Sequence, residues 1–306
     1  MNAGRFLLVV TGGSRGFGRC VAEEFVRQAI PSNPVDLILI SRSKTDLETA
    51  SSAIDKLAKT TTNADGLVVR TEALDLGDLD HLEANLEDVF SRIDPGRYSR
   101  AVLVNNAGSL GHISFANELP SLAKFRSEMD FNVTSASWLA SRFAAVFGAK
   151  KSDPTHEASS PGQSRAAGVN ASDGGTASAA DRDTPRDLSN NLVVNISSLA
   201  ALQPFESWGG YSSGKAARDM FHRQDFLFLA MEQASIGGLK VLNYAPGCMN
   251  TDMAREIRSA EQLEEDLQSG KYIEPVVSAE KCVRLVLSGT FVTGSHVDYW
   301  DKEEQV

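Results

Sequence analysis

Three polar side chains in the second half of the chain could together transfer a proton. Tyr211 and Lys215 stand four residues apart in a segment with helical spacing, Tyr211–Ala234, and therefore share one face of the predicted helix. A tyrosine titrates near pH ~10, so it can exchange protons at neutral pH only if a neighbouring ammonium stabilises its anion. This spacing alone is common by chance, but Ser198 follows the predicted strand Leu192–Ile196, where a parallel sheet holds its ligands. The three residues predict a proton-transfer site.

A glycine-rich turn near the N-terminus could hold the phosphates of a nucleotide. Residues Thr11–Gly18 read TGGSRGFG and join the predicted strand Arg5–Thr11 to the predicted helix Gly16–Ala29. Glycines permit a tight turn and a close approach of the backbone to a diphosphate, and the start of a helix adds free N–H groups. A purely structural turn is the alternative. The residues expected to contact a dinucleotide here are Gly12, Ser14, Arg15, Gly16, Phe17 and Gly18.

Two arginines indicate which dinucleotide this turn prefers. NAD-selective folds place an acidic residue near the end of the second strand, where it binds ribose hydroxyls. Here the predicted strand Leu37–Ile40 is followed by Ser41, Arg42 and Ser43, and Arg15 stands in the glycine turn. A guanidinium group can pair with a 2′-phosphate through parallel N–H donors. We therefore expect NADPH rather than NADH, with two solvated surface arginines as the alternative.

A large, regularly ordered domain must position these residues, and the chain can supply one. Segments with strand-like and helix-like spacing alternate along its 306 residues. Repeated strand–helix–strand units imply a parallel sheet with helices on both faces. We predict a single doubly wound α/β domain over residues 1–306. The other predicted strands are Leu67–Leu74, Ala101–Val104, Leu239–Tyr244 and His296–Tyr299, and the other predicted helices are Thr45–Lys59, Leu79–Ile93, Phe125–Phe147 and Ala279–Leu287.

One segment, residues 150–190, lacks the pattern of the rest. It contains no aromatic residue, and its only large aliphatic residues are Val169 and Leu188. Such a composition buries too little apolar surface to offset the entropy of an ordered chain. We predict a disordered insertion between a helix and the strand Leu192–Ile196, with a partner-binding or modification loop as the alternative.

The overall composition excludes several classes of protein. The formal net charge of −10 disfavours binding to nucleic acid. The three cysteines (Cys20, Cys248 and Cys282) contain no CxxC pair and predict neither a disulfide framework nor a zinc site. No apolar run of about 18 residues predicts a membrane span, and the start of the chain lacks signal-peptide features. We expect a cytoplasmic protein without a metal.

Further motifs complete a recognisable set. Asn105-Asn106-Ala107-Gly108 follows the predicted strand Ala101–Val104, and Asn132 lies within the predicted helix Phe125–Phe147. With the Thr11–Gly18 turn, Ser198 and Tyr211-Ser-Ser-Gly-Lys215, these motifs resemble the classical short-chain dehydrogenase/reductase family. The resemblance covers nearly the whole chain apart from residues 150–190. It implies a carbonyl reductase that uses NADPH.

The resemblance also implies a role for each residue of the proton-transfer site. Tyr211 would donate a proton to the carbonyl oxygen as hydride arrives from the nicotinamide. Lys215 would lower the pKa of this tyrosine and hold the nicotinamide ribose. Ser198 would hydrogen-bond the substrate oxygen, and Asn132 would hold a water molecule in the proton relay.

Several contacts with the cofactor follow from the same resemblance. Asn105 and Asn106 could instead serve only as turn formers, and Asp75 could be a helix cap. The contacts implied are Asp75 and Leu76 beside the adenine, Asn106, Ala107 and Gly108 beside the adenosine ribose, and Pro246, Gly247 and Thr251 beside the nicotinamide.

Longer strings narrow the substrate class. Residues 195–205, 214–220, 241–247 and 295–298 resemble the branch of the family that reduces side-chain ketones of pterins, as in tetrahydrobiopterin synthesis. The resemblance implies that Asp252 holds the guanidine-like edge of the pterin, because a carboxylate can accept two parallel N–H bonds from such an edge. Asp252 could instead cap the helix predicted to begin beside it. Leu199, Trp208 and Met253 could line the apolar part of the pocket or pack in the core, and the link Cys248–Asn250 borders the same region.

Two other functions stay open at this point. Relatives in this branch also reduce diketones and have no pterin role, so a benzil-type dicarbonyl reductase is one alternative. A scaffold protein that binds NADPH without turnover is a remote one, because such proteins usually lack the tyrosine or the lysine. The family resemblance further implies a homodimer formed through the segments Phe125–Phe147 and Tyr211–Ala234.

Overall fold

Seven parallel strands form the centre of the molecule, as the alternating strands and helices predict. The structure is a computed structural model that describes residues 4–148, 190–232 and 239–302, apart from the side chains of 224–232. The strand order is β3-β2-β1-β4-β5-β6-β7, and all neighbouring strands are parallel. The strands are β1 (Arg5–Thr11), β2 (Val35–Ser41), β3 (Leu67–Ala73), β4 (Tyr98–Asn105), β5 (Leu192–Ile196), β6 (Lys240–Ala245) and β7 (Ser295–Asp298).

The inner strands are buried on both faces. Along β1, Leu8 and Val10 pack into one apolar cluster, whereas Leu7 and Val9 pack into the other. A parallel sheet that is covered on both sides requires such continuous apolar runs, since successive side chains point to opposite faces. The run of β1 therefore contributes to both halves of the core at once.

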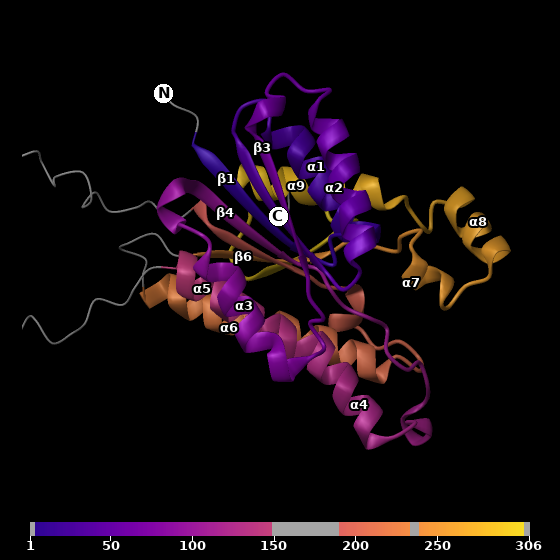
Figure 1. Ribbon diagram of the computed structural model, residues 1–306. Helices are drawn as coiled ribbons and strands as arrows, with labels where there is room; N and C mark the ends of the chain where they lie inside the picture. The colour runs from indigo at the N-terminus through magenta and orange to yellow at the C-terminus, as the bar shows by residue number, and fades with distance from the viewer. Residues whose placement is uncertain (1–3, 149–189, 233–238, 303–306) are drawn as a thin grey trace, which may run out of the picture.

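Helices cover both faces of the sheet, which confirms the predicted fold class (Figure 1). Helices α1 (Gly16–Ala29), α2 (Lys44–Ala58) and α9 (Pro275–Ser288) supply apolar side chains to the core on one face. Helices α3 (Leu79–Ser91), α5 (Ser135–Phe147) and α6 (Gly209–Glu232) pack against the other. The prediction of one domain over residues 1–306 stays a prediction, and the predicted insertion lies outside the described residues except for residue 190.

The strand order reverses beside β1, which pairs with β2 on one side and with β4 on the other. In a doubly wound sheet, ligands bind outside the carboxyl ends of the strands at such a reversal. The strand ends at Thr11, Asn105 and Ile196 carry the motifs singled out from the sequence. The fold therefore brings motifs that are distant in the sequence to one edge of the sheet.

The predicted helical stretch Phe125–Phe147 is helical throughout, but a π-helical turn divides it. The segment is a short helix α4 (Leu122–Met129), a π-helical turn (Asp130–Thr134) and α5. A π-helical turn contains one extra residue, which shifts the apolar face of the helix only slightly, so the spacing of apolar residues does not reveal the turn. Such turns are frequent at functional sites. The structure also adds α7 (Asp252–Arg255) and α8 (Ala260–Gln268), of which α8 begins with a capping box between Ser259 and Gln262.

Candidate active site

The glycine-rich turn after β1 leaves room that only glycine can provide. Gly12 and Gly16 have positive φ angles of 64° and 56°. A Cβ atom on Gly18 would lie 2.5 Å from the carbonyl oxygen of Gly12, whereas one on Gly16 would meet no atom within 4 Å. Helix α1 begins here, and its N-cap residue, Arg15, makes no capping hydrogen bond through its side chain. The turn therefore offers backbone N–H groups and open space, which fit the diphosphate of a dinucleotide.

The turn is fixed to the end of β4 by hydrogen bonds between two predicted motifs. The backbone N–H groups of Asn106 and Ala107 both donate to Thr11 Oγ1 at 2.9 Å, and Asn106 Nδ2 donates to the carbonyl oxygen of Thr11 at 2.9 Å. On the other side, Ser14 Oγ lies 2.9 Å from Ser41 Oγ at the end of β2. Asn106 is therefore more than a turn former, because its side chain joins β4 to β1.

The residues predicted to select the cofactor lie around this turn. Arg42 is exposed at the end of β2, and Arg15 is exposed and forms an ion pair with Asp252 at 3.1 Å. Asp75 Oδ1 accepts a hydrogen bond from the backbone N–H of Gly77 at 2.9 Å, and the N-cap of α3 is Asp78, so Asp75 does not cap that helix. Leu76 is buried in the core cluster under α3.

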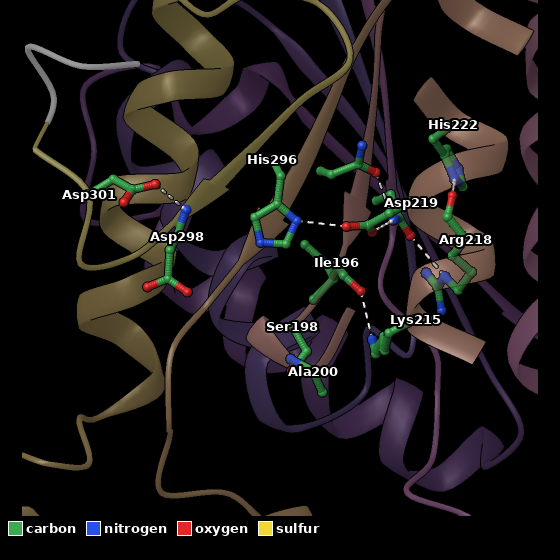
Figure 2. Close-up of polar contacts among 12 residues, drawn as sticks. Ile196, Ser198, Ala200, Lys215, Arg218, Asp219, His222, His296, Asp298 and Asp301 are labelled. Carbon is green, nitrogen blue, oxygen red and sulfur yellow. Dashed lines mark hydrogen bonds and ion pairs between the residues drawn. The ribbon is translucent and has the colours of Figure 1, made fainter. Parts of the chain in front are cut away.

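The structure brings Ser198, Tyr211 and Lys215 together at the carboxyl end of β5. Lys215 Nζ lies 5.5 Å from the centre of the Tyr211 ring. It donates a hydrogen bond to the carbonyl oxygen of Ile196 at 2.7 Å, which Figure 2 shows. The Ser198 side chain acts on the Tyr211 hydroxyl by lowering its pKa, and Ser198 Oγ accepts from the backbone N–H of Ala200 at 3.2 Å. The serine is thus fixed by the short helical turn that follows β5.

Burial and neighbouring groups set the proton affinities of this cluster. Burial raises the pKa of Tyr211 above its ordinary value, while the hydrogen bond with Ser198 and the charge of Arg218 act to lower it. Burial lowers the pKa of Lys215 well below its ordinary value, and the charge of Arg218 adds to this effect while that of Asp219 opposes it. Because burial is the largest of these effects, the pKa of Tyr211 stays above its ordinary value and the phenol form is favoured. Arg218 is the cation that reduces this pKa.

Asn132 occupies the π-helical turn and is tied to the loop after β4. Its Oδ1 accepts from the backbone N–H of Ser109 at 2.9 Å, and its Nδ2 donates to the carbonyl oxygen of Ser109 at 3.1 Å. The side chain is buried. A Cβ atom on Gly108 would lie 3.4 Å from Asn132 Oδ1, so the small residue at this position lets the loop pass closely.

A cavity of about 450 Å³ opens beside Trp208. Trp208 packs edge-to-face against the Tyr211 ring, with the ring centres 5.4 Å apart. The lining of the cavity combines apolar side chains, one aromatic ring and one carboxylate, a mixture that is typical of pockets for small ligands. The lining residues are Leu110, Gly111, Ile113, Trp208, Glu256 and Ile257.

The turn after β6 forms a further border of this region. Pro246 is buried and Gly247 has a φ angle of 78°, where a side chain would be strained. Thr251 is the N-cap of α7, with Oγ1 accepting from the backbone N–H of Ala254 at 3.4 Å. The alternative that Asp252 caps this helix is therefore wrong, because Asp252 is its first residue. Asp252 is exposed, and its two carboxylate oxygens pair with Arg15 and with Arg255.

Sequence reasoning missed several charged residues near the site. Glu256 lines the cavity, and Asp298 ends β7 at the same edge of the sheet, beside Ala245 in register. The position of Asp298 at a strand end is the signal that could have found it. Arg218 lies seven residues after Tyr211 and three after Lys215, so helical spacing, which puts it on the same face, is the signal that could have found it.

Comparison with known proteins identifies the family. The family model described as short chain dehydrogenase matches residues 7–153 and 185–262. The chain belongs to the short-chain dehydrogenase family. Its two matched segments exclude residues 154–184, which fall within the predicted insertion.

Individual relatives place the chain within this family. It is 34% identical to a sepiapterin reductase from Rattus norvegicus over 98% of this chain and 100% of the relative. It is 26% identical to a benzil reductase ((S)-benzoin forming) from Bacillus subtilis over 83% and 79% of the two chains. Among solved structures, it resembles a putative NAD(P) dependent gluconate 5-dehydrogenase from Beutenbergia cavernae, with a TM-score of 0.67, 20% identity and coverage of 97% and 96%.

These findings define the class of enzyme. The chain is an NADP-dependent short-chain oxidoreductase that acts on a carbonyl or alcohol, and it resembles sepiapterin reductases more than benzil reductases. Within the described residues, no three His, Cys, Asp or Glu side chains gather closely enough to hold a metal ion. Among the helices that the structure describes, none combines the length and apolarity needed to span a membrane.

Proposed function

We propose that this enzyme reduces the side-chain ketone of a pterin such as sepiapterin with NADPH. The observation that carries the proposal is the similarity to a sepiapterin reductase over the whole length of that relative. The cavity beside Trp208 supports it, because the indole ring and the Glu256 carboxylate in its lining suit a flat ring with a guanidine-like edge. Such a reaction would serve tetrahydrobiopterin synthesis.

In this proposal each residue acts on a stated atom. The nicotinamide, when bound, supplies the hydride to the carbonyl carbon. Ser198 holds the substrate oxygen, and the Tyr211 hydroxyl gives that oxygen its proton. Lys215 holds the nicotinamide ribose and stabilises the phenolate that remains. Asn132 fixes the loop after β4 and holds a water molecule through which the proton is replaced.

The test is a direct assay of the purified protein with NADPH, in which the loss of NADPH absorbance is followed with sepiapterin or with benzil. We expect a higher kcat/KM for sepiapterin. Turnover of benzil without turnover of sepiapterin would instead support the dicarbonyl reductase. Binding of NADPH without turnover of either compound would support the scaffold protein.

Replacing Asp252 by Asn tests the proposed anchor of the pterin. If the carboxylate holds the guanidine-like edge, we expect KM for sepiapterin to rise about 10-fold, which corresponds to one hydrogen bond to a charged group, with a smaller change in kcat. Asp298→Asn and Glu256→Gln are the matched variants. An unchanged KM in Asp252→Asn together with a raised KM in Asp298→Asn would move the anchor to the end of β7.

Replacing Arg42 by Ala tests the cofactor preference. Because the arginine is exposed at the end of β2, its loss leaves the fold unchanged but removes a charged partner for the 2′-phosphate. We expect KM for NADPH to rise about 10-fold while KM for NADH stays the same. Steady-state kinetics with both cofactors measure this, and Arg27→Ala on the far part of α1 is the control. Equal changes for both cofactors would contradict the assignment.

The remaining features are predictions from the family. A homodimer through α4, α5 and α6 agrees with the exposure of two apolar side chains on these helices, Leu122 and Met220. A cytoplasmic location is the other such prediction.

A further inference from the structure

A fully buried arginine lies one helical turn beyond Lys215 on α6. The guanidinium of Arg218 donates to the backbone carbonyl oxygens of Asn105 and, at 2.9 Å, Ala107, and its Nε donates to Asn195 Oδ1 at 2.8 Å. These acceptors belong to the end of β4, the loop that follows it and the end of β5. The arginine therefore fastens the helix that carries the tyrosine to the strand ends that border the cofactor.

The charge of Arg218 is balanced by the next residue of the helix. Asp219 Oδ1 accepts from Asn195 Nδ2 at 2.9 Å, and its Oδ2 accepts from His296 Nδ1 on β7 at 2.6 Å (Figure 2). Burial lowers the pKa of Arg218 to about 10, which leaves it charged at neutral pH. Burying a charged group costs free energy that its hydrogen bonds must offset, so stability alone gives a weak reason for the presence of Arg218.

We propose that Arg218 is a positioning residue for proton donation, which sets Tyr211 and Lys215 against the ends of β4 and β5 and supplies the positive charge that acts on the phenol. This inference rests on Tyr211 as the proton donor. It gives the arginine a role that the tyrosine–lysine motif does not include.

The surroundings of Arg218 support this role. A Cβ atom on Gly108 would lie 3.7 Å from Arg218 Nη1 and 3.4 Å from Asn132 Oδ1, so the guanidinium lies close to the loop that Asn132 holds. The charge of Arg218 lowers the pKa of both Tyr211 and Lys215. It thereby favours the phenolate form of Tyr211 and disfavours the ammonium form of Lys215.

The other titratable groups near these residues are few. Tyr211 interacts with Arg218 on its own helix, lies near Lys215 and is influenced by Cys248 after β6. Arg218 is influenced by Asp219 and Tyr211, and its carbonyl oxygen lies 2.7 Å from His222 Nδ1. Burial lowers the pKa of His222 to about 4, so this imidazole is neutral in the working range. His296 on β7 hydrogen-bonds with Asp219, the residue that follows Arg218.

The test compares Arg218→Met and Arg218→Lys with the same two changes at Arg100. Arg100 is a suitable control because its guanidinium also donates to backbone carbonyls, those of Val286 and Leu287, but lies at the opposite end of β4. Two readouts are taken: the pH dependence of kcat with sepiapterin or benzil, whichever turns over, and the tyrosinate absorbance of each protein minus that of its Tyr211→Phe variant.

Because Tyr211 donates its proton, the rate falls as the pH rises through the pKa of the tyrosine. Loss of the charge in Arg218→Met should therefore move this fall, and the appearance of tyrosinate, to higher pH by about 1 unit. Arg218→Lys keeps the charge but cannot reach all three acceptors, so we expect an unmoved profile and a kcat that is about 10-fold lower. The variants of Arg100 should melt at lower temperature without either change.

Two outcomes would overturn the inference. The first is an Arg218→Met protein whose pH profile and tyrosinate titration coincide with those of the wild type. If Arg218→Met does not fold, the second outcome decides: an Arg218→Lys protein whose kcat equals that of Arg100→Lys. Activity that survives Tyr211→Phe would instead reject the proton donor itself, so failure of the proposed function is distinguishable from failure of this inference.

Discussion

Replacing Tyr211 by Phe is expected to lower kcat by about 10²–10⁴-fold, the range typical of the loss of a general acid. The change removes only the hydroxyl of Tyr211, and the ring can keep its edge-to-face contact with Trp208. The fold and the affinity for NADPH should therefore stay close to those of the wild type. Steady-state kinetics and NADPH binding followed by fluorescence measure the two effects separately.

Tyr98→Phe is the matched control for this variant. The Tyr98 hydroxyl donates to Asp36 Oδ2 at 2.8 Å near the amino end of β4, far from the cofactor turn. Its loss should lower the free energy of unfolding by about 1 kcal/mol and leave kcat unchanged. A Tyr211→Phe protein that keeps the rate of Tyr98→Phe would show that another group donates the proton.

The sequence predicted those residues of the site whose chemically useful side chains stand directly beside the end of a strand or the start of a helix. The Thr11–Gly18 turn, Ser198 and the Tyr211–Lys215 pair each lie directly at the end of a strand or the start of a helix. In a parallel sheet, the alternation of strands and helices is enough to bring such ends to one edge. The fold class and the neighbourhood of these residues therefore followed from spacing and element order.

The parts that could not be predicted depend on contacts between residues far apart in the sequence. Arg218 shares the helix face of Tyr211 and Lys215, but its acceptors lie up to 113 residues away, so the local sequence does not show what balances its donors. Arg15 and Asp252 were assigned separately to cofactor and substrate, yet they pair with each other across 237 residues. Likewise, the π-helical turn at Asn132 meets the loop at Ser109, a contact that helical spacing does not contain.

Lys215 combines a functional position with an unfavourable environment. Its amino group is buried and donates a hydrogen bond to the carbonyl oxygen of Ile196. Because burial and the charge of Arg218 lower its pKa, the folded protein favours the neutral amine, whereas the unfolded chain keeps the proton up to about pH 10.4. Between the lowered pKa of the folded state and the ordinary pKa of the unfolded chain, the unfolded state binds one more proton. The free energy of unfolding of the wild type therefore rises with pH by at most about 1.4 kcal/mol per pH unit.

Lys215→Met is therefore expected to change activity and stability in different ways. Activity should fall by about 10²–10⁴-fold, because the variant loses the amino group that holds the ribose and lies beside the Tyr211 ring. The variant should also lose the rise of stability with pH, so that the difference in free energy of unfolding, variant minus wild type, decreases as the pH increases towards 10. Urea unfolding at a series of pH values measures this difference.

Lys240→Met, which removes a lysine bonded to the carbonyl oxygen of Gly289 away from the site, is the control and should show no such trend. A difference that stays constant with pH would mean that Lys215 is protonated in the folded enzyme, and that its charge is stabilised before the cofactor binds.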